Sequence, residues 1–277
     1  MECIELDNKI KITDVHDLDL AQTLDCGQSF RWKSQADGSF HGVAYGKSVS
    51  VSLDNTDMYI ENATADDFKN IWYNYFDFAL DYGKIREEIS TIHPVLNEAA
   101  KYAPGIRILR QEPFEALCTF IISQNNNIKR IKGIVERLCE SFGTQLADSE
   151  FAFPTAETLA KLSPDDLAPL RAGFRNRYII DAAQKVANGE VNLDSCFTLD
   201  YEDARAELMK IIGVGKKVAD CTLLFGMHRI EAFPIDVWMK RAMEKLFPNM
   251  TGDDFGKYAG IAQQYIFHYS RMHPELF

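Results

Sequence analysis

A glycine hairpin within residues 208–236 constrains the fold of this chain more than any other stretch. One apolar residue separates Gly213 from Gly215, and an apolar run precedes them. Glycine accepts positive φ at little steric cost, so two glycines this close together allow a tight turn. Apolar side chains then recur at helical spacing over residues 218–225. We therefore predict a helix, a short hairpin and a second helix over about residues 205–226.

The start of the second helix offers a place for an anion. Its first N–H groups have no partner within the helix and carry partial positive charge. Because Gly213 and Gly215 bear no side chain, a phosphate could approach these groups closely, with Lys216 beside it. An ordinary helix-turn-helix core element explains the same glycines, since short glycine motifs are common.

Lys217 and Asp236 add chemistry to the hairpin. Lys217 falls in the first turn of the second helix, and Cys221 lies four residues on, on the same face. The positive helix end, the neighbouring Lys216 and partial burial all disfavour a charged ammonium. A neutral lysine amine can act as a nucleophile and form a Schiff base. Asp236 follows Pro234 where the next helix should begin, and a carboxylate there could hold a nucleophile or steady a developing cation.

The overall charge argues against a nucleic-acid partner, whereas the local charge allows one. The 277 residues have a formal net charge of −11, and nucleic-acid-binding domains are usually basic on their binding face. Local charge matters more than the total, and basic residues gather near 129–132, 171–177, 210–217 and 240–241. Taken singly, each cluster is equally well explained as a solvated helix face.

Cysteine spacing and hydropathy bound the class of protein. None of the six cysteines forms a CxxC pair, which argues against a zinc site and against a disulfide scaffold. No secretory signal or membrane-length apolar run is visible. We expect a soluble intracellular protein of the cytoplasm or nucleus, monomeric, with no membrane partner, no cofactor and no resident metal ion.

Two hydrophobic patterns divide the chain. Over residues 48–53 valine and leucine alternate with serine, the period of two of a half-buried strand, and the DG dipeptide at 37–38 is a hairpin signal. After residue 64 the apolar spacing is helical. We predict an α+β fold, with an N-terminal antiparallel sheet domain and flanking helices (1–104) packed on a mostly helical domain (105–277).

Five motifs resemble the helix-hairpin-helix (HhH-GPD) DNA glycosylases of base excision repair, and most closely the 8-oxoguanine DNA glycosylases. The motifs, in the order of that family, are GQSFRW from Gly27, SQNNNIKR from Ser123, GFRNR from Gly173, GVGKKVAD from Gly213 with FPIDVW from Phe233, and YAGIAQQYIF from Tyr258. The resemblance implies a bifunctional glycosylase and abasic-site (AP) lyase. It implies that Lys217 is the nucleophile that attacks the sugar C1′ and that Asp236 is the catalytic carboxylate.

The resemblance also implies a pocket for the extruded base. The carbonyl of Gly27 would accept the N7–H that 8-oxoguanine has and guanine lacks. The N7 of normal guanine is an acceptor, so its lone pair would face the lone pair of the Gly27 carbonyl. A buried polar group left without a hydrogen bond costs about 1–3 kcal/mol. Gln263 would bond the Watson–Crick edge of the base, while Phe267 and Cys221 would sandwich its ring. Gln263 and Phe267 share a face of a predicted last helix over 252–269. Without the resemblance, the usual interpretation of this pair is a surface amide and a core aromatic.

Four further residues would act where the base has left the stack. By the resemblance, Asn125 fills the gap and bonds the orphaned cytosine, and Arg130 reads that cytosine. Phe174 would be a wedge beside it and Arg175 a further contact to it. The family more often has tyrosine at position 174, so a stacking role survives without a hydroxyl contact. Trp238 stands where the family has histidine, which removes one phosphate contact.

Two other functions stay open at this point. The first is a glycosylase of the same scaffold for another damaged base. Lys217 argues against the monofunctional branch, and GQSFRW argues against thymine-glycol enzymes. The second is a non-catalytic DNA-binding protein, which would explain the hairpin but not the pairing of Lys217 with Asp236. The partner we expect is double-stranded DNA in which 8-oxoguanine is paired with cytosine.

Overall fold

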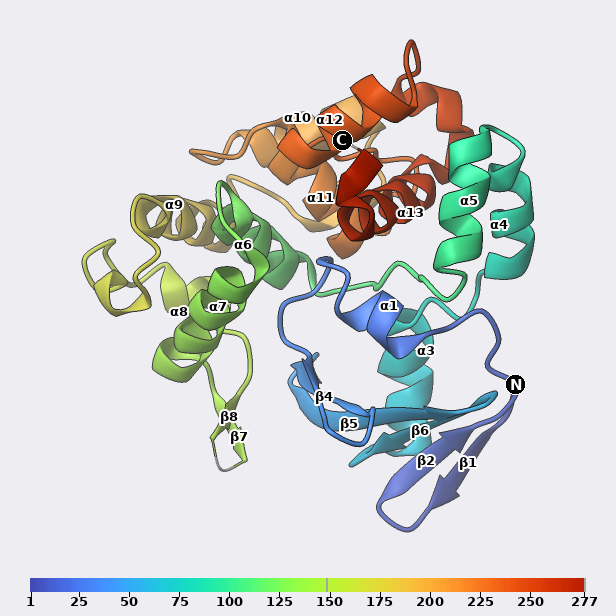
Figure 1. Cartoon of the computed structure of the whole chain (residues 1–277). Helices are drawn as coiled ribbons and strands as arrows, with labels where there is room; N and C mark the ends of the chain where they lie inside the picture. Colours follow the sequence, from blue (N-terminus) through green and yellow to red (C-terminus); the bar gives the residue numbers. More distant parts are fainter. Residues whose placement is uncertain (148, 277) are drawn as a thin grey trace.

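The N-terminal part of the chain folds into an antiparallel sheet, and the later part is mainly helical (Figure 1). The computed structural model describes residues 1–147 and 149–276. The six strands lie in the order β1-β2-β6-β5-β4-β3. They are β1 (Cys3–Leu6), β2 (Lys9–Ile12), β3 (Lys33–Ser34), β4 (Phe40–Ala44), β5 (Lys47–Asp54) and β6 (Asp57–Glu61). The predicted α+β fold is confirmed, and the DG turn joins β3 to β4.

The alternation in β5 explains how the sheet buries one face. Val49 and Val51 are fully buried, and the register places Val51 opposite Ile60 of β6. Successive side chains of a strand point to opposite faces, so the serines between the valines lie on the other side. Helices α1 (Leu20–Leu24) and α3 (Tyr73–Tyr75) cover the buried face, and their Leu24 and Tyr75 belong to the same apolar cluster.

The helices of the later part surround a second and larger core. They are α4 (Tyr82–Ser90), α5 (Pro94–Tyr102), α6 (Pro113–Ser123), α7 (Ile128–Phe142), α8 (Ala156–Leu159), α9 (Arg175–Ala187), α10 (Tyr201–Met209), α11 (Lys216–Gly226), α12 (Val237–Leu246) and α13 (Ala259–Met272). A short hairpin of β7 (Gln145–Ala147) and β8 (Glu150–Phe151) follows α7.

Helices α4 and α5 pack with the later helices rather than with the sheet. Ile89 of α4 and Leu96 of α5 lie in the same buried cluster as Ile261 of α13. Figure 1 shows α5 beside α13, and the two helices are in contact. The domain division at residue 104 stays a prediction, but by packing these two helices belong to the helical body.

The last predicted helix, over 252–269, is not continuous. Residues Gly252–Tyr258 form a 3₁₀ segment, and α13 begins only at Ala259. Gly256 lies within the 3₁₀ segment and has φ +64 and ψ −149, a conformation outside any right-handed helix. The break gives α13 its own direction, and this helix carries Gln263 and Phe267.

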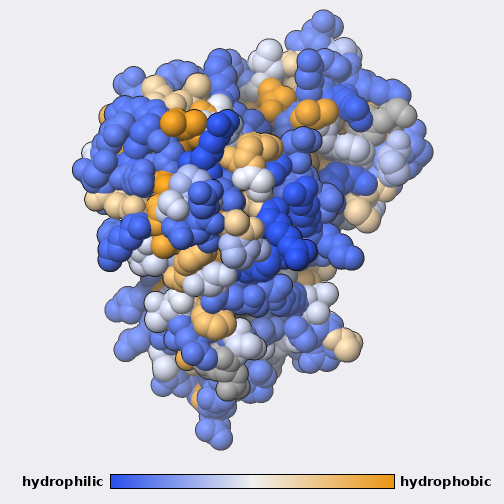
Figure 2. Space-filling view, turned by 90° about the vertical axis from the view of Figure 1, so that its left-hand side faces the viewer, coloured by the Kyte–Doolittle hydropathy of each residue, from blue (hydrophilic) through white to orange (hydrophobic). Residues whose placement is uncertain are grey.

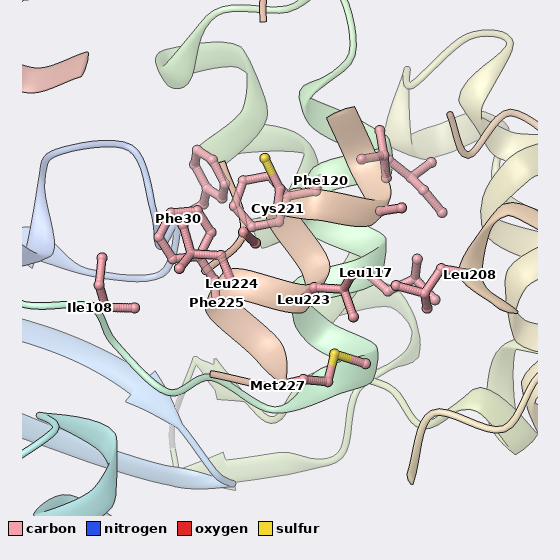
Figure 3. Close-up of a cluster of buried hydrophobic side chains, with 14 of the residues drawn as sticks. Phe30, Ile108, Leu117, Phe120, Leu208, Cys221, Leu223, Leu224, Phe225 and Met227 are labelled. Atoms are coloured by element: carbon pink, nitrogen blue, oxygen red, sulfur yellow. The ribbon is translucent and has the colours of Figure 1, made fainter. Parts of the chain in front are cut away.

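Apolar packing between α6 and α11 holds the second helix of the hairpin in place (Figure 3). The rings of Phe120 and Phe225 stack with centroids 5.3 Å apart, and Phe30 meets Phe120 edge-on at 6.0 Å. Leu117 and Leu224 are also fully buried in this cluster. Burying one such side chain stabilises the fold by about 1.5–3 kcal/mol, so this packing fixes α11 against α6.

Candidate active site

The predicted helix-hairpin-helix is present, and its two glycines serve different purposes. Gly213, after α10, has φ +81, and a Cβ there would lie 2.4 Å from the ring of Tyr178. Only glycine fits that position. Gly215 caps α11 in an extended conformation with φ −101, and a Cβ there would meet nothing within 4 Å. The turn therefore requires Gly213, whereas Gly215 leaves open space before the first N–H groups of α11.

Lys217 lies in the first turn of α11, as predicted, and is half-buried. Its Nζ donates a hydrogen bond to Oγ of Ser123 at 2.9 Å and lies 5.3 Å from the centroid of the Phe120 ring. Both neighbours belong to the last turns of α6. The amine is therefore held against α6 instead of extending freely into solvent.

Asp236 lies at the start of α12 and caps that helix. Its Oδ1 accepts a hydrogen bond from the backbone N–H of Met239 at 2.7 Å. Burial raises the pKa of the Cys221 thiol to about 11, the Lys217 ammonium opposes this rise, and the Asp236 carboxylate adds to it. Lys217 and Asp236 thus both act on one buried thiol, so their side chains converge although they are distant in sequence.

Lys217 and Asp236 line two hollows at once. On one side lies a small hollow of about 50 Å³, the inner pocket. On the other lies a wider hollow of about 590 Å³, the open groove. The inner pocket is also lined by Gly27, Phe120, Cys221, Phe225, Pro234, Gln263, Gln264 and Phe267. The open groove is also lined by Ser123, Gln124, Asn125, Asn126, Gly215, Val218, Ile235, Val237 and Trp238.

The inner pocket brings together every residue predicted to hold the base, namely Gly27, Cys221, Gln263 and Phe267. Gln263 is 6% exposed, and its Oε1 is buried without a hydrogen-bond partner among the described residues. Leaving a buried acceptor without a hydrogen bond destabilises the fold by about 1–3 kcal/mol. A ligand that donates an N–H group to it would remove this destabilisation. Gly27 has φ +92, and a Cβ there would lie 3.5 Å from the Phe267 ring.

The asparagine turn between α6 and α7 forms one edge of the open groove. Asn125 is exposed and left-handed, with φ +46. The guanidinium of Arg175 donates to the carbonyl oxygens of Gln124 (3.0 Å), Asn125 (3.1 Å) and Ala172 (3.0 Å). Arg175 is only 3% exposed. Most of its donors are therefore used by the backbone, and its predicted contact to cytosine stays a prediction.

The other residues predicted to meet the duplex lie at the surface near this turn. Phe174 is 49% exposed, and the Arg175 guanidinium lies 4.4 Å from its ring centroid. Arg130 is exposed in the first turn of α7. Figure 2 shows the face on which α9 lies as mainly hydrophilic, with small scattered apolar positions. Trp238 donates from Nε1 to Oγ of Ser270 at 2.9 Å, which ties α12 to α13.

Two family models divide this chain between them. The model described as the 8-oxoguanine DNA glycosylase N-terminal domain matches residues 10–117. The model of the HhH-GPD superfamily base excision DNA repair proteins matches residues 118–257. The chain belongs to the 8-oxoguanine DNA glycosylase family. The resemblance found in the sequence is thereby confirmed.

Relatives support this membership over nearly the whole length of the glycosylase. The N-glycosylase/DNA lyase of Saccharomyces cerevisiae is 33% identical over 83% of this chain and 68% of its own length. A structure of the Clostridium acetobutylicum 8-oxoguanine glycosylase/lyase with DNA containing cytosine opposite 8-oxoguanine has a TM-score of 0.94 at 38% identity. A structure of MBOgg1 with a low-affinity DNA ligand has a TM-score of 0.95 at 42% identity. Both structures cover 99% of each chain.

The structural role of Gln28 in this glycosylase was not predicted from the sequence. Gln28 is fully buried, and its Nε2 donates to the carbonyls of Thr23 (2.9 Å) and Arg107 (2.7 Å). Gln111 donates from Nε2 to the Gln28 carbonyl at 2.7 Å and from its backbone N–H to Phe225 of α11 at 2.8 Å. These bonds fix the Gly27 loop relative to α11. The available signal was a glutamine near Phe30 and Trp32, two residues expected in the core.

The described residues offer neither a metal cluster nor a membrane span. Across 1–147 and 149–276, no group of three or more His, Cys, Asp or Glu side chains could hold a metal ion. In the same part of the glycosylase, no helix is long and apolar enough to cross a bilayer.

Proposed function

We propose that this protein removes 8-oxoguanine from duplex DNA and then nicks the abasic strand, with Lys217 as the nucleophile for both steps. One observation carries the proposal above the others. The Lys217 amine and the Asp236 carboxylate line both the inner pocket and the open groove, so they stand where the two hollows meet. A sugar carbon held at that boundary would have its base on one side and its strand on the other.

The reaction follows from this placement. The lone pair of the Lys217 nitrogen forms a bond to C1′ as the bond from C1′ to the base breaks. The base leaves with the electrons of the broken bond and takes up the proton that the newly bonded nitrogen releases. The sugar ring opens to give a Schiff base between Lys217 and C1′. Loss of a C2′ proton then breaks the C3′–O bond by β-elimination, and water releases the lysine. The Asp236 carboxylate stabilises the positive charge that develops on the sugar.

Recognition of the base is assigned to the inner pocket. Gly27 and Gln263 both line this pocket, and each would offer an oxygen to a ring that enters it. The carbonyl of Gly27 would accept the N7–H that distinguishes 8-oxoguanine from guanine, and the unpaired Oε1 of Gln263 would accept from the Watson–Crick edge. Phe267 and Cys221 would flank the ring.

Contacts to the rest of the duplex are assigned to the open groove and its rim. Asn125 would occupy the space left by the base, and Arg130 and Phe174 would meet the unpaired cytosine. The hairpin from Gly213 to Lys216 would bind a phosphate through the free N–H groups at the start of α11. We further propose that the enzyme acts as a monomer, because each of these residues comes from the same chain.

Borohydride trapping on a duplex with 8-oxoguanine opposite cytosine tests the proposal. Borohydride reduces a Schiff base to a stable amine, so the wild-type protein should become covalently joined to the DNA. Lys217→Gln should give no adduct. Lys217→Arg should give none either, although it keeps the positive charge, because arginine stays protonated in proteins.

The control is Lys84→Gln, since Lys84 is exposed on α4 and pairs with Asp81. This variant should form the adduct at the wild-type rate. An adduct that persists in Lys217→Gln would place the nucleophile elsewhere. Equal adduct on an undamaged guanine–cytosine duplex would contradict the assignment of the lesion.

A further inference from the structure

We propose that Ser123 is a positioning residue, which orients the Lys217 amine and joins it to the asparagine turn that meets the duplex. The proposal rests on the function proposed above, because it takes Lys217 as the nucleophile. Ser123 is the last residue of α6 and lines the open groove. Its hydroxyl is the hydrogen-bond acceptor for Nζ of Lys217, at 2.9 Å.

The hydroxyl of Ser123 has its direction fixed by α6. Its Oγ donates to the carbonyl of Phe120 at 2.8 Å, so its single hydrogen is already used. It can therefore only accept from Lys217, not donate to it. A neutral amine has two hydrogens and one lone pair. An acceptor that engages a hydrogen turns the lone pair elsewhere and keeps it free for attack on carbon.

The aromatic ring beside the amine limits its motion further. Nζ of Lys217 lies 5.3 Å from the centroid of Phe120, the same residue whose carbonyl orients the Ser123 hydroxyl. A free lysine side chain loses rotamer entropy when it is held in one orientation. Holding the amine before the substrate arrives removes part of that cost from the reaction step.

The same segment reaches the duplex-facing turn within two residues. Ser123 is followed by Gln124, the C-terminal cap of α6, and by the left-handed Asn125. Arg175 holds the carbonyl oxygens of both following residues. A displacement of the turn when Asn125 enters the duplex would therefore act on Ser123 and, through its hydroxyl, on the Lys217 amine.

The test compares two substrates under single-turnover conditions with enzyme in excess. The first is a duplex with 8-oxoguanine opposite cytosine, and the second is a duplex with a preformed abasic site, trapped with borohydride. Ser123→Ala should slow both reactions about tenfold, because both need the same amine orientation. Its dissociation constant for either duplex should change less than about twofold.

Two further variants test whether the loss of rate comes from the missing hydroxyl or from a change in helix α6. Ser123→Thr keeps the hydroxyl and should restore both rates to within about threefold of wild type. Thr119→Val is the matched control, because the Thr119 hydroxyl also donates to a carbonyl three residues back, at 3.0 Å, and lines neither hollow. That variant should leave both rates unchanged.

Each contrary result overturns the inference in a recognisable way. If Ser123→Ala keeps both rates while Lys217→Gln loses its adduct, Ser123 does not position the amine and the proposed function stands. If only the 8-oxoguanine duplex is slowed and its binding weakens, Ser123 acts on the turn alone. If Ser123→Thr is as slow as Ser123→Ala, the hydroxyl is not the cause. An adduct in Lys217→Gln would instead refute the proposed function.

Discussion

The inner pocket and the open groove share Lys217 and Asp236 but are built in opposite ways. The pocket joins three distant parts of the chain, the loop at Gly27, helix α11 and helix α13, and buried hydrogen bonds hold them together. The groove consists of helix ends and a turn near the surface, where Ile235 is 46% exposed and Val237 72% exposed. A pocket that selects one base needs side chains held in fixed positions, whereas a duplex can be bound by residues at the surface.

The two hollows also differ in how their polar groups are satisfied. In the pocket, Oε1 of Gln263 is buried and has no hydrogen-bond partner within residues 1–147 and 149–276, an arrangement that favours a ligand with matching donors. On the rim of the groove, Arg175 satisfies the carbonyls of the asparagine turn. Pocket variants should therefore change which base is removed, and groove variants should change how the duplex is held. Variants at the shared boundary should affect both.

The largest effect is expected at that boundary. Asp236→Asn should slow 8-oxoguanine excision and abasic-site trapping about 10²–10³-fold, because it removes the charge that stabilises the cationic sugar. Asparagine is as good a helix N-cap as aspartate, so the melting temperature should stay within about 2 °C. Single-turnover rates and thermal melts measure the two effects. A rate within tenfold of wild type would show that the carboxylate is not catalytic.

A pocket variant should separate base removal from strand nicking. Gln263→Met removes the unpaired Oε1 at similar volume, and excision of 8-oxoguanine should fall about 10–100-fold, as expected for a lost buried hydrogen bond. Nicking of a preformed abasic site should be unchanged, since no base is present. Gln264→Met is the contrast, because Gln264 bonds Cys26 at 3.0 Å and its loss should lower the melting temperature. Equal loss on both substrates in Gln263→Met would refute the pocket assignment.

The two hairpin glycines should separate stability from DNA binding. Gly213→Ala places a Cβ 2.4 Å from the Tyr178 ring in a left-handed conformation, so we expect a loss of about 1–3 kcal/mol in the free energy of unfolding. Gly215→Ala meets no neighbour, so its stability should be unchanged. Its methyl group would stand before the helix end and weaken duplex binding several-fold. If both variants bind DNA as tightly as wild type, the hairpin does not hold a phosphate.

A variant at the rim of the groove should change only the choice of the opposite base. Arg130→Met should reduce the preference for cytosine opposite the lesion about tenfold, because one polar contact to a base is worth about 1–3 kcal/mol of discrimination. Cleavage of four duplexes that differ only in the opposite base measures this preference. Abasic-site trapping should stay near the wild-type rate. An unchanged order of the four bases would remove Arg130 from the readout of cytosine.

Much of the fold followed from short-range patterns. The alternation around Val51 predicted β5, and the DG dipeptide predicted the turn between β3 and β4. Lys217 and Asp236 were identifiable because the chemistry of each depends on its own helix end, which local sequence encodes. The break at Gly256 was missed, because an isolated glycine inside a helical pattern is usually tolerated.

Contacts between residues far apart in the chain could not be predicted from the sequence pattern. The bonds of Gln28 reach Arg107 and Gln111, and the guanidinium of Arg175 reaches Gln124. Nothing in the spacing of these residues marks their partners, because hydrogen-bond partners of buried groups are decided by which elements pack together. The contact of Ser123 with Lys217 belongs to the same class, since it exists only because α11 lies against α6.

The sequence by itself determined the chemistry available to this protein: an amine at a helix start, a carboxylate at another, and a glycine turn beside them. Each depends on a few neighbouring residues, and the motifs that contain them identify the family. Only the tertiary structure decided where these groups meet. Packing of α6, α11 and α13 around the Gly27 loop closes a pocket on one side of the amine and leaves a groove on the other.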